Sequence, residues 1–128
     1  MVWDTNSIIF FLQDLRPKPS KDFLLNELRR NKPKFSIITE IELLSWKKLS
    51  ESEAKLISGF LFNFYRVELS EEIKEATIQV RRTHGLKVPD AIIAASALIL
   101  NQPLLTHNLK DFKLVKGLEV LDPMSFEV

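Results

Sequence analysis

The apolar run from Ala91 to Leu100 is the feature that most constrains how this chain can fold. Ser96 is its only polar residue, and a helix that is apolar on all sides must be buried on all sides. The run is about half as long as a membrane-spanning helix, so it predicts the central helix of a soluble core. Pro89 and Asp90 stand directly before it, which places a carboxylate at the entrance to the most buried helix.

Short apolar segments alternate with helical patterns along the rest of the sequence. This alternation predicts an α/β domain with a central, mostly parallel sheet. The expected strands are 2–3, 35–38, 65–67, 102–105 and 119–121. The expected helices are 8–12, 21–31, 39–49, 51–61, 71–84, 90–100 and 109–112. The sequence contains no linker, repeat or low-complexity segment, so we expect one domain over residues 1–128.

Capping patterns mark several of the expected helix ends. Ser50 and Glu53 have the spacing of a capping box, in which each side chain bonds the other residue's backbone N–H. Ser20 and Ser70 are the expected N-caps of the helices that follow them. Gly85 is the expected C-cap of the helix before it.

The composition excludes several classes of protein. Eighteen Lys and Arg residues against seventeen Asp and Glu give a formal charge of +1, so any nucleic-acid contact must come from local basic patches. The chain has no cysteine, which excludes disulfides, thiolate metal sites and cysteine nucleophiles. Its first residues lack the basic region of a secretory signal. We therefore expect a soluble cytoplasmic protein.

Acidic residues follow several of the expected strands. Asp4 comes directly after the first strand, Glu40 and Glu42 follow the second, and Asp111 lies shortly after the fourth. Asp90 opens the apolar helix that could pack beside them. Open α/β sheets bind their ligands at the carboxyl ends of the strands. The sequence therefore predicts that these acids lie near one ligand site.

Each acid also has a purely local explanation. Thr39 and Glu42 have the spacing of a capping box, and Asp90 can serve as an N-cap. Asn108 with Asp111 resembles an N-cap followed by an acidic first turn. The first of the acids could simply make a turn. Capping and ligand binding are compatible at one residue, because helix N-termini favour anions.

The convergence of four acids favours a metal site. Two carboxylates about 5 Å apart repel by roughly 3 kcal/mol at an effective dielectric near 20, so a cluster needs protons or a divalent cation. All-oxygen ligation selects Mg²⁺ or Mn²⁺ rather than Zn²⁺, and such ions commonly activate water beside phosphoryl oxygens. His84 and His107 are too few and too isolated for a zinc site.

Four motifs in order make the sequence similar to a known family. They are VWDTNSII, SIITEIELL, KVPDAIIAASAL and LLTHNLKDF. Together they resemble the PIN-domain ribonucleases, most closely the VapC-like toxins of prokaryotic toxin–antitoxin pairs, over essentially the whole chain. The resemblance implies a three-layer α/β/α sandwich and Mg²⁺- or Mn²⁺-dependent cleavage of RNA. It also implies homodimers and inhibition by a cognate antitoxin protein.

The resemblance assigns roles to particular residues. The metal-binding and catalytic quartet falls on Asp4, Glu42, Asp90 and Asp111. The supporting polar positions fall on Thr5, Asn6, Thr106 and Asn108. The motif passes over Glu40, and His107 stands where such proteins often carry Arg. The implied reaction is hydrolysis by a metal-activated water, with the ions held by Asp4, Asp90 and at least one of the other two acids.

Two basic clusters have two explanations each. Residues 29–34 form one, and Arg81, Arg82 and Lys87 form the other. Each is either a solvated helix end or a contact for RNA phosphates. The second cluster is the better candidate for RNA contact because it directly precedes Asp90.

The aromatic residues also have two explanations. Trp3, Trp46, Phe60, Phe62 and Phe64 are expected in the core. Trp46 and the row from Phe60 to Phe64 have a dimer or antitoxin groove as the alternative.

Two functions other than a ribonuclease are also compatible with an α/β fold that carries carboxylates. A phosphoacceptor receiver needs paired acids after the first strand and a lysine after the last, and the sequence shows neither. A non-catalytic PIN-fold module that only binds RNA or protein remains the alternative, against which the four intact acids argue.

Overall fold

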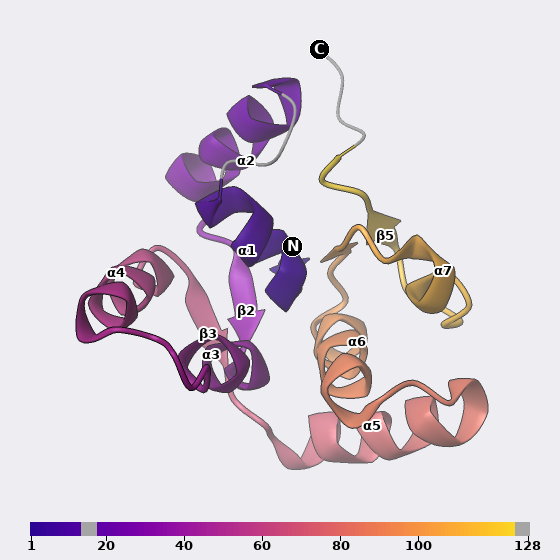
Figure 1. Ribbon diagram of the computed structural model, residues 1–128. Coiled ribbons are helices and arrows are strands. Elements are labelled where there is room, and N and C mark those ends of the chain that lie inside the picture. Colours follow the sequence, from indigo (N-terminus) through magenta and orange to yellow (C-terminus); the bar gives the residue numbers. More distant parts are fainter. Residues whose placement is uncertain (14–17, 125–128) are drawn as a thin grey trace.

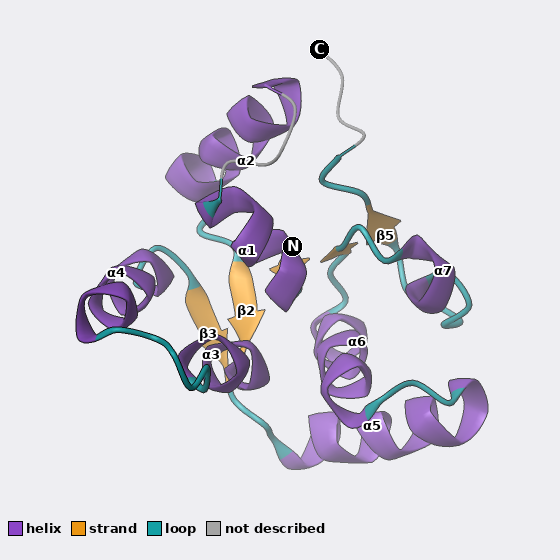
Figure 2. Ribbon diagram, viewed as in Figure 1, coloured by secondary structure: helices purple, strands orange, loops and turns teal. Residues whose placement is uncertain are grey.

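The computed structural model describes residues 1–13 and 18–124, and in these residues the strands form one parallel sheet (Figures 1 and 2). The sheet order is β3-β2-β1-β4-β5. The strands are β1 (Val2–Trp3), β2 (Lys34–Ser36), β3 (Tyr65–Val67), β4 (Leu104–Leu105) and β5 (Val120–Leu121). The helices are α1 (Thr5–Leu12), α2 (Lys18–Arg30), α3 (Ile37–Leu44), α4 (Glu51–Leu61), α5 (Glu71–His84), α6 (Val88–Leu100) and α7 (Leu109–Phe112).

Strands β1 and β4 direct alternate side chains to opposite faces of the sheet, as the pleat of a strand requires. Val2 and Leu104 pack with α5, α6 and α7, whereas Trp3 and Leu105 pack with α1, α2, α3 and α4. Figure 1 shows these two groups of helices on either side of the strands. A parallel sheet with both faces covered is an α/β/α sandwich, so the predicted fold class is confirmed.

The apolar run forms α6, as predicted. Its residues from Ala91 to Ala97 are all buried, because α5 covers the side of the helix that faces away from the sheet. Across residues 1–13 and 18–124, no single helix is long and apolar enough to cross a membrane. Only α5 and α6 taken together, bent by 118°, reach that length and composition.

Most of the predicted caps form. The Ser50 side chain accepts from the Glu53 N–H, and the Glu53 carboxylate accepts from the Ser50 N–H, each at 3.1 Å. Ser70 caps α5, and Gly85 ends it in the left-handed conformation with φ 67°. This conformation is open to glycine at little cost.

The predicted boundary between the second strand and its helix was wrong. The strand ends at Ser36 rather than at 38, and Ser36 caps α3 by accepting from the Ile38 N–H at 3.2 Å. Thr39 and Glu42 therefore lie inside the helix and form no capping box. Two β-branched isoleucines suggested a longer strand, but the serine hydroxyl before them provides an earlier helix start.

Three other expectations also fail. α1 begins at Thr5 rather than at 8, and α2 begins at Lys18, so Ser20 is not its N-cap. The expected loop over 16–20 falls partly on residues 14–17, which lie outside the described residues. α3 ends at Leu44 rather than at 49, which leaves Trp46 beyond the helix.

Two aromatic side chains expected in the core are exposed. Trp46 is 53% exposed and Phe62 is 84% exposed. Trp3 and Phe64 are buried, and Phe60 packs partly buried against them. Only Phe62 of this row stays outside, because it lies just past the end of α4 with its side chain exposed.

Candidate active site

The candidate site lies where the strand order of the sheet reverses. From β1 the chain adds β2 and β3 on one side, then returns to add β4 and β5 on the other. The carboxyl ends of β1 and β4 therefore meet at a topological switch point, the usual ligand position in such sheets. Asp4 follows β1 there and its N–H donates to the Leu105 carbonyl at 3.0 Å. The residues from Thr106 to Asn108 follow β4 at the same edge.

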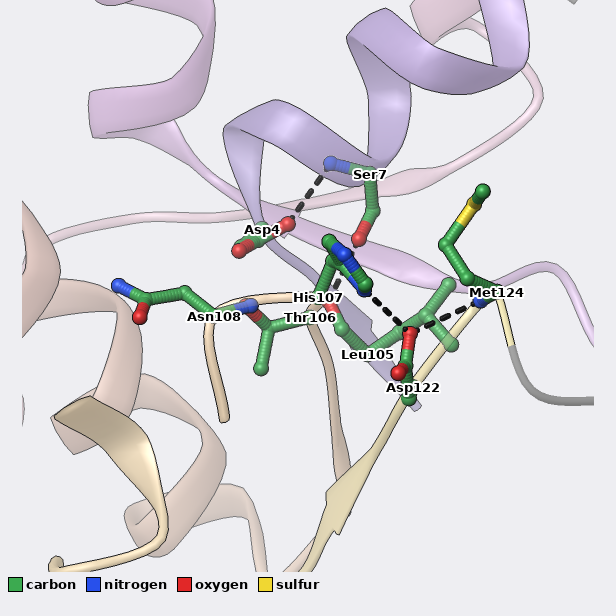
Figure 3. Close-up of polar contacts among 8 residues, drawn as sticks. All are labelled: Asp4, Ser7, Leu105, Thr106, His107, Asn108, Asp122 and Met124. Carbon is green, nitrogen blue, oxygen red and sulfur yellow. Dashed lines mark hydrogen bonds and ion pairs between the residues drawn. The ribbon is translucent and has the colours of Figure 1, made fainter. Parts of the chain in front are cut away.

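Asp4 is held firmly in a buried position. It is the N-cap of α1, and its Oδ1 accepts from the Ser7 N–H at 2.8 Å (Figure 3). The carboxylate is 5% exposed and also has a hydrogen bond with the Thr106 side chain. Burial raises the pKa of Asp4, and the nearby charge of Glu42 raises it further, against the opposing effect of these hydrogen bonds.

Asp90 is not the cap of α6. Lys87 occupies the N-cap position, and Asp90 is the third residue of the helix. Among the described residues, nothing donates a hydrogen bond to its half-buried carboxylate or pairs with it. Burial raises the pKa of Asp90, and Glu42, Asp4 and Asp111 each raise it further, whereas Lys87 lowers it. The three other predicted acids are therefore close enough for their charges to act on Asp90.

Glu42 and Glu40 point to different surroundings. The Thr5 hydroxyl donates to Glu42 Oε1 at 2.7 Å, and Thr5 Oγ1 lies 3.0 Å from Thr39 Oγ1. Glu40 instead pairs with Arg66 of β3, with Nη1 and Oε2 3.2 Å apart. The structure thus brings Glu42 beside the residue that follows Asp4 and holds Glu40 toward the edge strand.

Asp111 is the fourth of the predicted acids and lies on α7. The Asn108 side-chain amide donates to Asp111 Oδ2 at 3.1 Å. Asn108 occupies the N-cap position, but its side chain makes no capping hydrogen bond. Its own N–H donates to Thr106 Oγ1 at 3.0 Å. Asp111 is exposed, in contrast to the buried Asp4.

The carboxylates do not form a finished metal site as they stand. In residues 1–13 and 18–124, no three acidic or histidine side chains are grouped tightly enough to hold one ion. Their mutual effects on the Asp90 pKa nevertheless place them in one electrostatic neighbourhood. The arrangement is a region of concentrated negative charge that can attract a cation.

The other predicted polar and basic residues surround this region. Asn6 is exposed at the second position of α1. Arg81 and Arg82 are exposed in the last turn of α5, and Arg81 Nε donates to the Leu86 carbonyl at 3.0 Å. Lys87 is the one member of this cluster whose charge acts on the Asp90 pKa.

The basic cluster at 29–34 lies at the opposite edge. Lys34 starts β2, and its N–H donates to the Met1 carbonyl at 3.0 Å. Because the strands are parallel, this is the edge away from Asp4. The Lys32 ammonium lies 4.3 Å from the centre of the Tyr65 ring. These contacts place Lys32 and Lys34 away from the acids.

Two neighbours of the site were not predicted as functional residues. Ser7 Oγ donates to the Leu105 carbonyl at 2.9 Å, which fixes α1 to the end of β4. Asp122 Oδ1 lies 2.9 Å from His107 Nδ1. Asp122 directly follows β5, so the rule that placed the other acids at strand ends could have identified it.

Comparison with known proteins decides the family. The PIN domain family matches residues 1–118. The chain belongs to the PIN domain family. No curated protein matches the sequence. The family assignment confirms the predicted fold and the resemblance on which the residue roles were based.

Several solved structures are similar to this chain over nearly its whole length. A toxin–antitoxin complex from Klebsiella pneumoniae has a TM-score of 0.76 and 29% identity, covering 95% of this chain and 96% of that one. VapBC-1 from nontypeable Haemophilus influenzae has a TM-score of 0.79 and 26% identity, covering 96% and 98%. DNA-bound VapBC from Salmonella typhimurium shares the fold, with a TM-score of 0.81 and 22% identity over 95% and 96%.

Proposed function

We propose that this PIN-domain chain is a divalent-metal-dependent ribonuclease and the toxin of a toxin–antitoxin module. The observation that carries the proposal is the environment of the Asp90 carboxylate. This carboxylate is half-buried and accepts no hydrogen bond from the described residues, and its pKa is raised by burial and by three other acids. An ionised group in that position is costly unless a cation joins it. The similarity to toxin–antitoxin complexes supports the same proposal.

The donors fit a hard divalent cation. Carboxylate oxygens are the ligands that Mg²⁺ and Mn²⁺ prefer. Asp4, Asp90 and at least one of Glu42 and Asp111 would hold the ion directly or through water. Among the described residues no three such side chains are grouped closely enough for one ion, so the acids would have to move toward the ion. This suits Asp90, to which no described residue donates a hydrogen bond, and the exposed Asp111. When bound, such an ion lowers the pKa of a coordinated water and stabilises charge on phosphate oxygens.

The polar residues of the site orient the acids in this proposal. Thr5 holds Glu42, Thr106 holds Asp4, and Asn108 holds Asp111. Hydrogen bonds of this kind fix the direction in which a carboxylate offers its remaining oxygen. Each of these three acids thus has at least one hydrogen-bond partner, and Asp90 has the freedom to adjust to the ion.

The substrate side of the site is assigned to exposed residues. Asn6 lies one residue after Thr5 at the same edge of the sheet. Arg81, Arg82 and Lys87 lie before Asp90 and supply the positive charge that an RNA backbone needs. Lys87 is the strongest candidate because its charge reaches the acidic region.

An RNA cleavage assay tests the function. The recombinant chain should cut single-stranded RNA with Mn²⁺ or Mg²⁺ and should be inactive in EDTA. The Asp90→Asn variant should cleave at least about 100-fold more slowly, as expected for loss of a metal ligand. A wild-type chain that binds RNA tightly but cuts none with either ion would instead establish the non-catalytic binding module.

An apolar groove supports an antitoxin as the partner. It has a volume of about 280 Å³ and lies between α1, α3 and α4. Its lining includes Leu12, Leu43, Trp46, Leu49, Leu56 and Ile57. Trp46 is 53% exposed and Leu56 73% exposed, so we propose that an apolar helix of the antitoxin covers them. A basic side chain from the same segment would then enter the acidic region.

A neutralisation assay tests this partner. A co-expressed antitoxin should abolish RNA cleavage by the wild type but not by Leu56→Glu, which places a charge in the groove. The Leu56→Glu chain alone should cleave RNA at the wild-type rate, because the groove is separate from the acids. Equal neutralisation of both chains would place the antitoxin elsewhere. Light scattering at micromolar concentration should show the homodimer that we also propose.

A further inference from the structure

Asp122 joins the end of the last strand to the loop that follows β4. Its Oδ1 accepts from the Met124 N–H at 2.9 Å and lies 2.9 Å from His107 Nδ1 (Figure 3). The Asp122 side chain is 14% exposed, whereas that of His107 is 54% exposed. A nearly buried carboxylate is therefore directed at a ring that solvent could reach. A carboxylate only accepts hydrogen bonds, so Nδ1 carries the proton between them.

The His107 ring is held from a second side. It meets the ring of Phe10 from α1, with centroids 6.2 Å apart and planes inclined by 70°. Exposed side chains ordinarily keep their rotamer freedom, and fixing one has an entropic cost. Two contacts from two different elements hold this imidazole in one orientation. Its fixed position therefore calls for an explanation beyond solvation.

The neighbours of His107 in sequence provide that explanation. Thr106 N–H donates to the Leu121 carbonyl at 2.8 Å, and the Thr106 side chain bonds Asp4. Asn108 on the other side donates to Asp111. His107 thus lies between Thr106, which contacts the buried Asp4, and Asn108, which contacts the exposed Asp111. Any rotation of the loop about His107 would move both contacts.

We propose that Asp122 and His107 form a positioning pair for the acidic site. The pair fastens the loop from Thr106 to Asn108 between β5 and α1. Through that loop it keeps one hydroxyl on Asp4 and one amide on Asp111. Neither member touches the reacting atoms, so both act through the acids. This inference depends on the proposed ribonuclease function for its meaning, but the pair itself can be tested separately.

Four substitutions in the full chain test the pair. His107→Ala and Asp122→Ala should each lower kcat for RNA cleavage about 10-fold with KM within about twofold, at temperatures well below melting. The double variant should lose no more than Asp122→Ala alone, because that variant already breaks the contact with His107. Asp122→Asn should stay near the wild-type rate, since its amide oxygen still accepts from Nδ1–H and from the Met124 N–H.

A control variant separates positioning from general stability. Glu68→Ala breaks an exposed pair with Arg66, 2.7 Å long, on β3 away from the loop. It should leave kcat unchanged. The pair would have no positioning role if His107→Ala cleaved at the wild-type rate. The same conclusion would follow if the two losses added, or if each loss were explained by the unfolded fraction.

Metal titration keeps the inference distinct from the proposed function. The Mn²⁺ concentration that gives half of the thermal stabilisation should rise about 10-fold in His107→Ala and Asp122→Ala, because the acids lose their orientation. It should stay near wild type in Asp122→Asn and Glu68→Ala. A wild type that cuts no RNA would contradict the ribonuclease, whereas an unchanged midpoint in both alanine variants would contradict the positioning pair.

Discussion

Glu53 and Asp90 occupy the same position in two helices and behave in opposite ways. Each is the third residue of its helix, in α4 and α6 respectively. Glu53 completes a capping box with Ser50, and these hydrogen bonds lower its pKa. Asp90 makes no such bond with the described residues, and burial together with three neighbouring acids raises its pKa. One carboxylate therefore stabilises its helix, and the other is held in an unfavourable place.

The difference shows that a position in the first turn of a helix does not explain why residue 90 is an aspartate. A carboxylate in the first turn ordinarily benefits from the helix dipole and the free N–H groups. Asp90 has that position but gains no hydrogen bond among the described residues. It lies instead where Glu42, Asp4 and Asp111 make its negative charge costly. A group kept at such a cost is a candidate for function rather than for stability.

The largest effect is expected between the two glutamates of α3. Glu42→Gln should lower RNA cleavage at least about 100-fold, because it removes a charge from the proposed metal ligands. Glu40→Gln should leave the rate within about twofold of wild type, because Glu40 pairs with Arg66 outside the site. Rates under single-turnover conditions measure both. A larger loss from Glu40→Gln would mean that the motif assignment is misplaced.

The pH dependence of stability should distinguish Asp90 from Glu53. The raised pKa of Asp90 means that its carboxyl group holds a proton more tightly in the folded protein than in the unfolded chain. Stability is therefore lost as pH rises above the ordinary value of 3.8. In EDTA, the stability gained by Asp90→Asn should grow by about 1 kcal/mol between about pH 4 and pH 7.

Glu53→Gln should show the reverse tendency. A lowered pKa contributes stability above the ordinary value and loses it as pH falls. Glu53→Gln should therefore be no more stable than wild type near neutral pH. Urea unfolding at several pH values measures both variants. Identical pH profiles for the two would contradict the contrast between the carboxylates.

The smallest effect on RNA cleavage is expected from the helix cap alone. Ser50→Ala removes the hydroxyl that accepts from Glu53 N–H and should lower the free energy of unfolding by about 1 kcal/mol. RNA cleavage should not change, because α4 lies away from the acids. Chemical denaturation and the cleavage assay together measure this variant. A loss of activity in the folded protein would show that the capping box also serves the site.

Much of the fold could be predicted because periodicity and caps carry its signals. The alternation of short apolar strands with helices predicted the parallel sheet, and Ser70 and Gly85 predicted the ends of α5. The start of α3 could not be read from composition, since Ile37 and Ile38 favour strands and only Ser36 reveals the cap. Local sequence also could not show that Phe62 leaves the core, because the exposure of a residue just past a helix end depends on how the chain packs there.

Part of the candidate site was also predictable from the sequence, because the expected sheet topology indicates where the strands end. Residues at the ends of strands follow from the topology, so the four acids could be grouped before their positions were known. The pairing of Asp122 with His107 joins two strands that are neighbours only in the folded sheet. The absence of a cap on α6 also depends on backbone geometry, since Asp90 after Pro89 matches a cap in sequence.

Thermal melting of Asp90→Asn in EDTA and in Mn²⁺ tests the central claim most directly. If Asp90 is one of several repelling metal ligands, the variant should melt roughly 3–5 °C above wild type in EDTA, corresponding to about 1 kcal/mol. It should lose most of the stabilisation that Mn²⁺ gives the wild type. Melting at the wild-type temperature in EDTA, with the full Mn²⁺ response retained, would contradict the claim and make Asp90 an ordinary residue of the first turn.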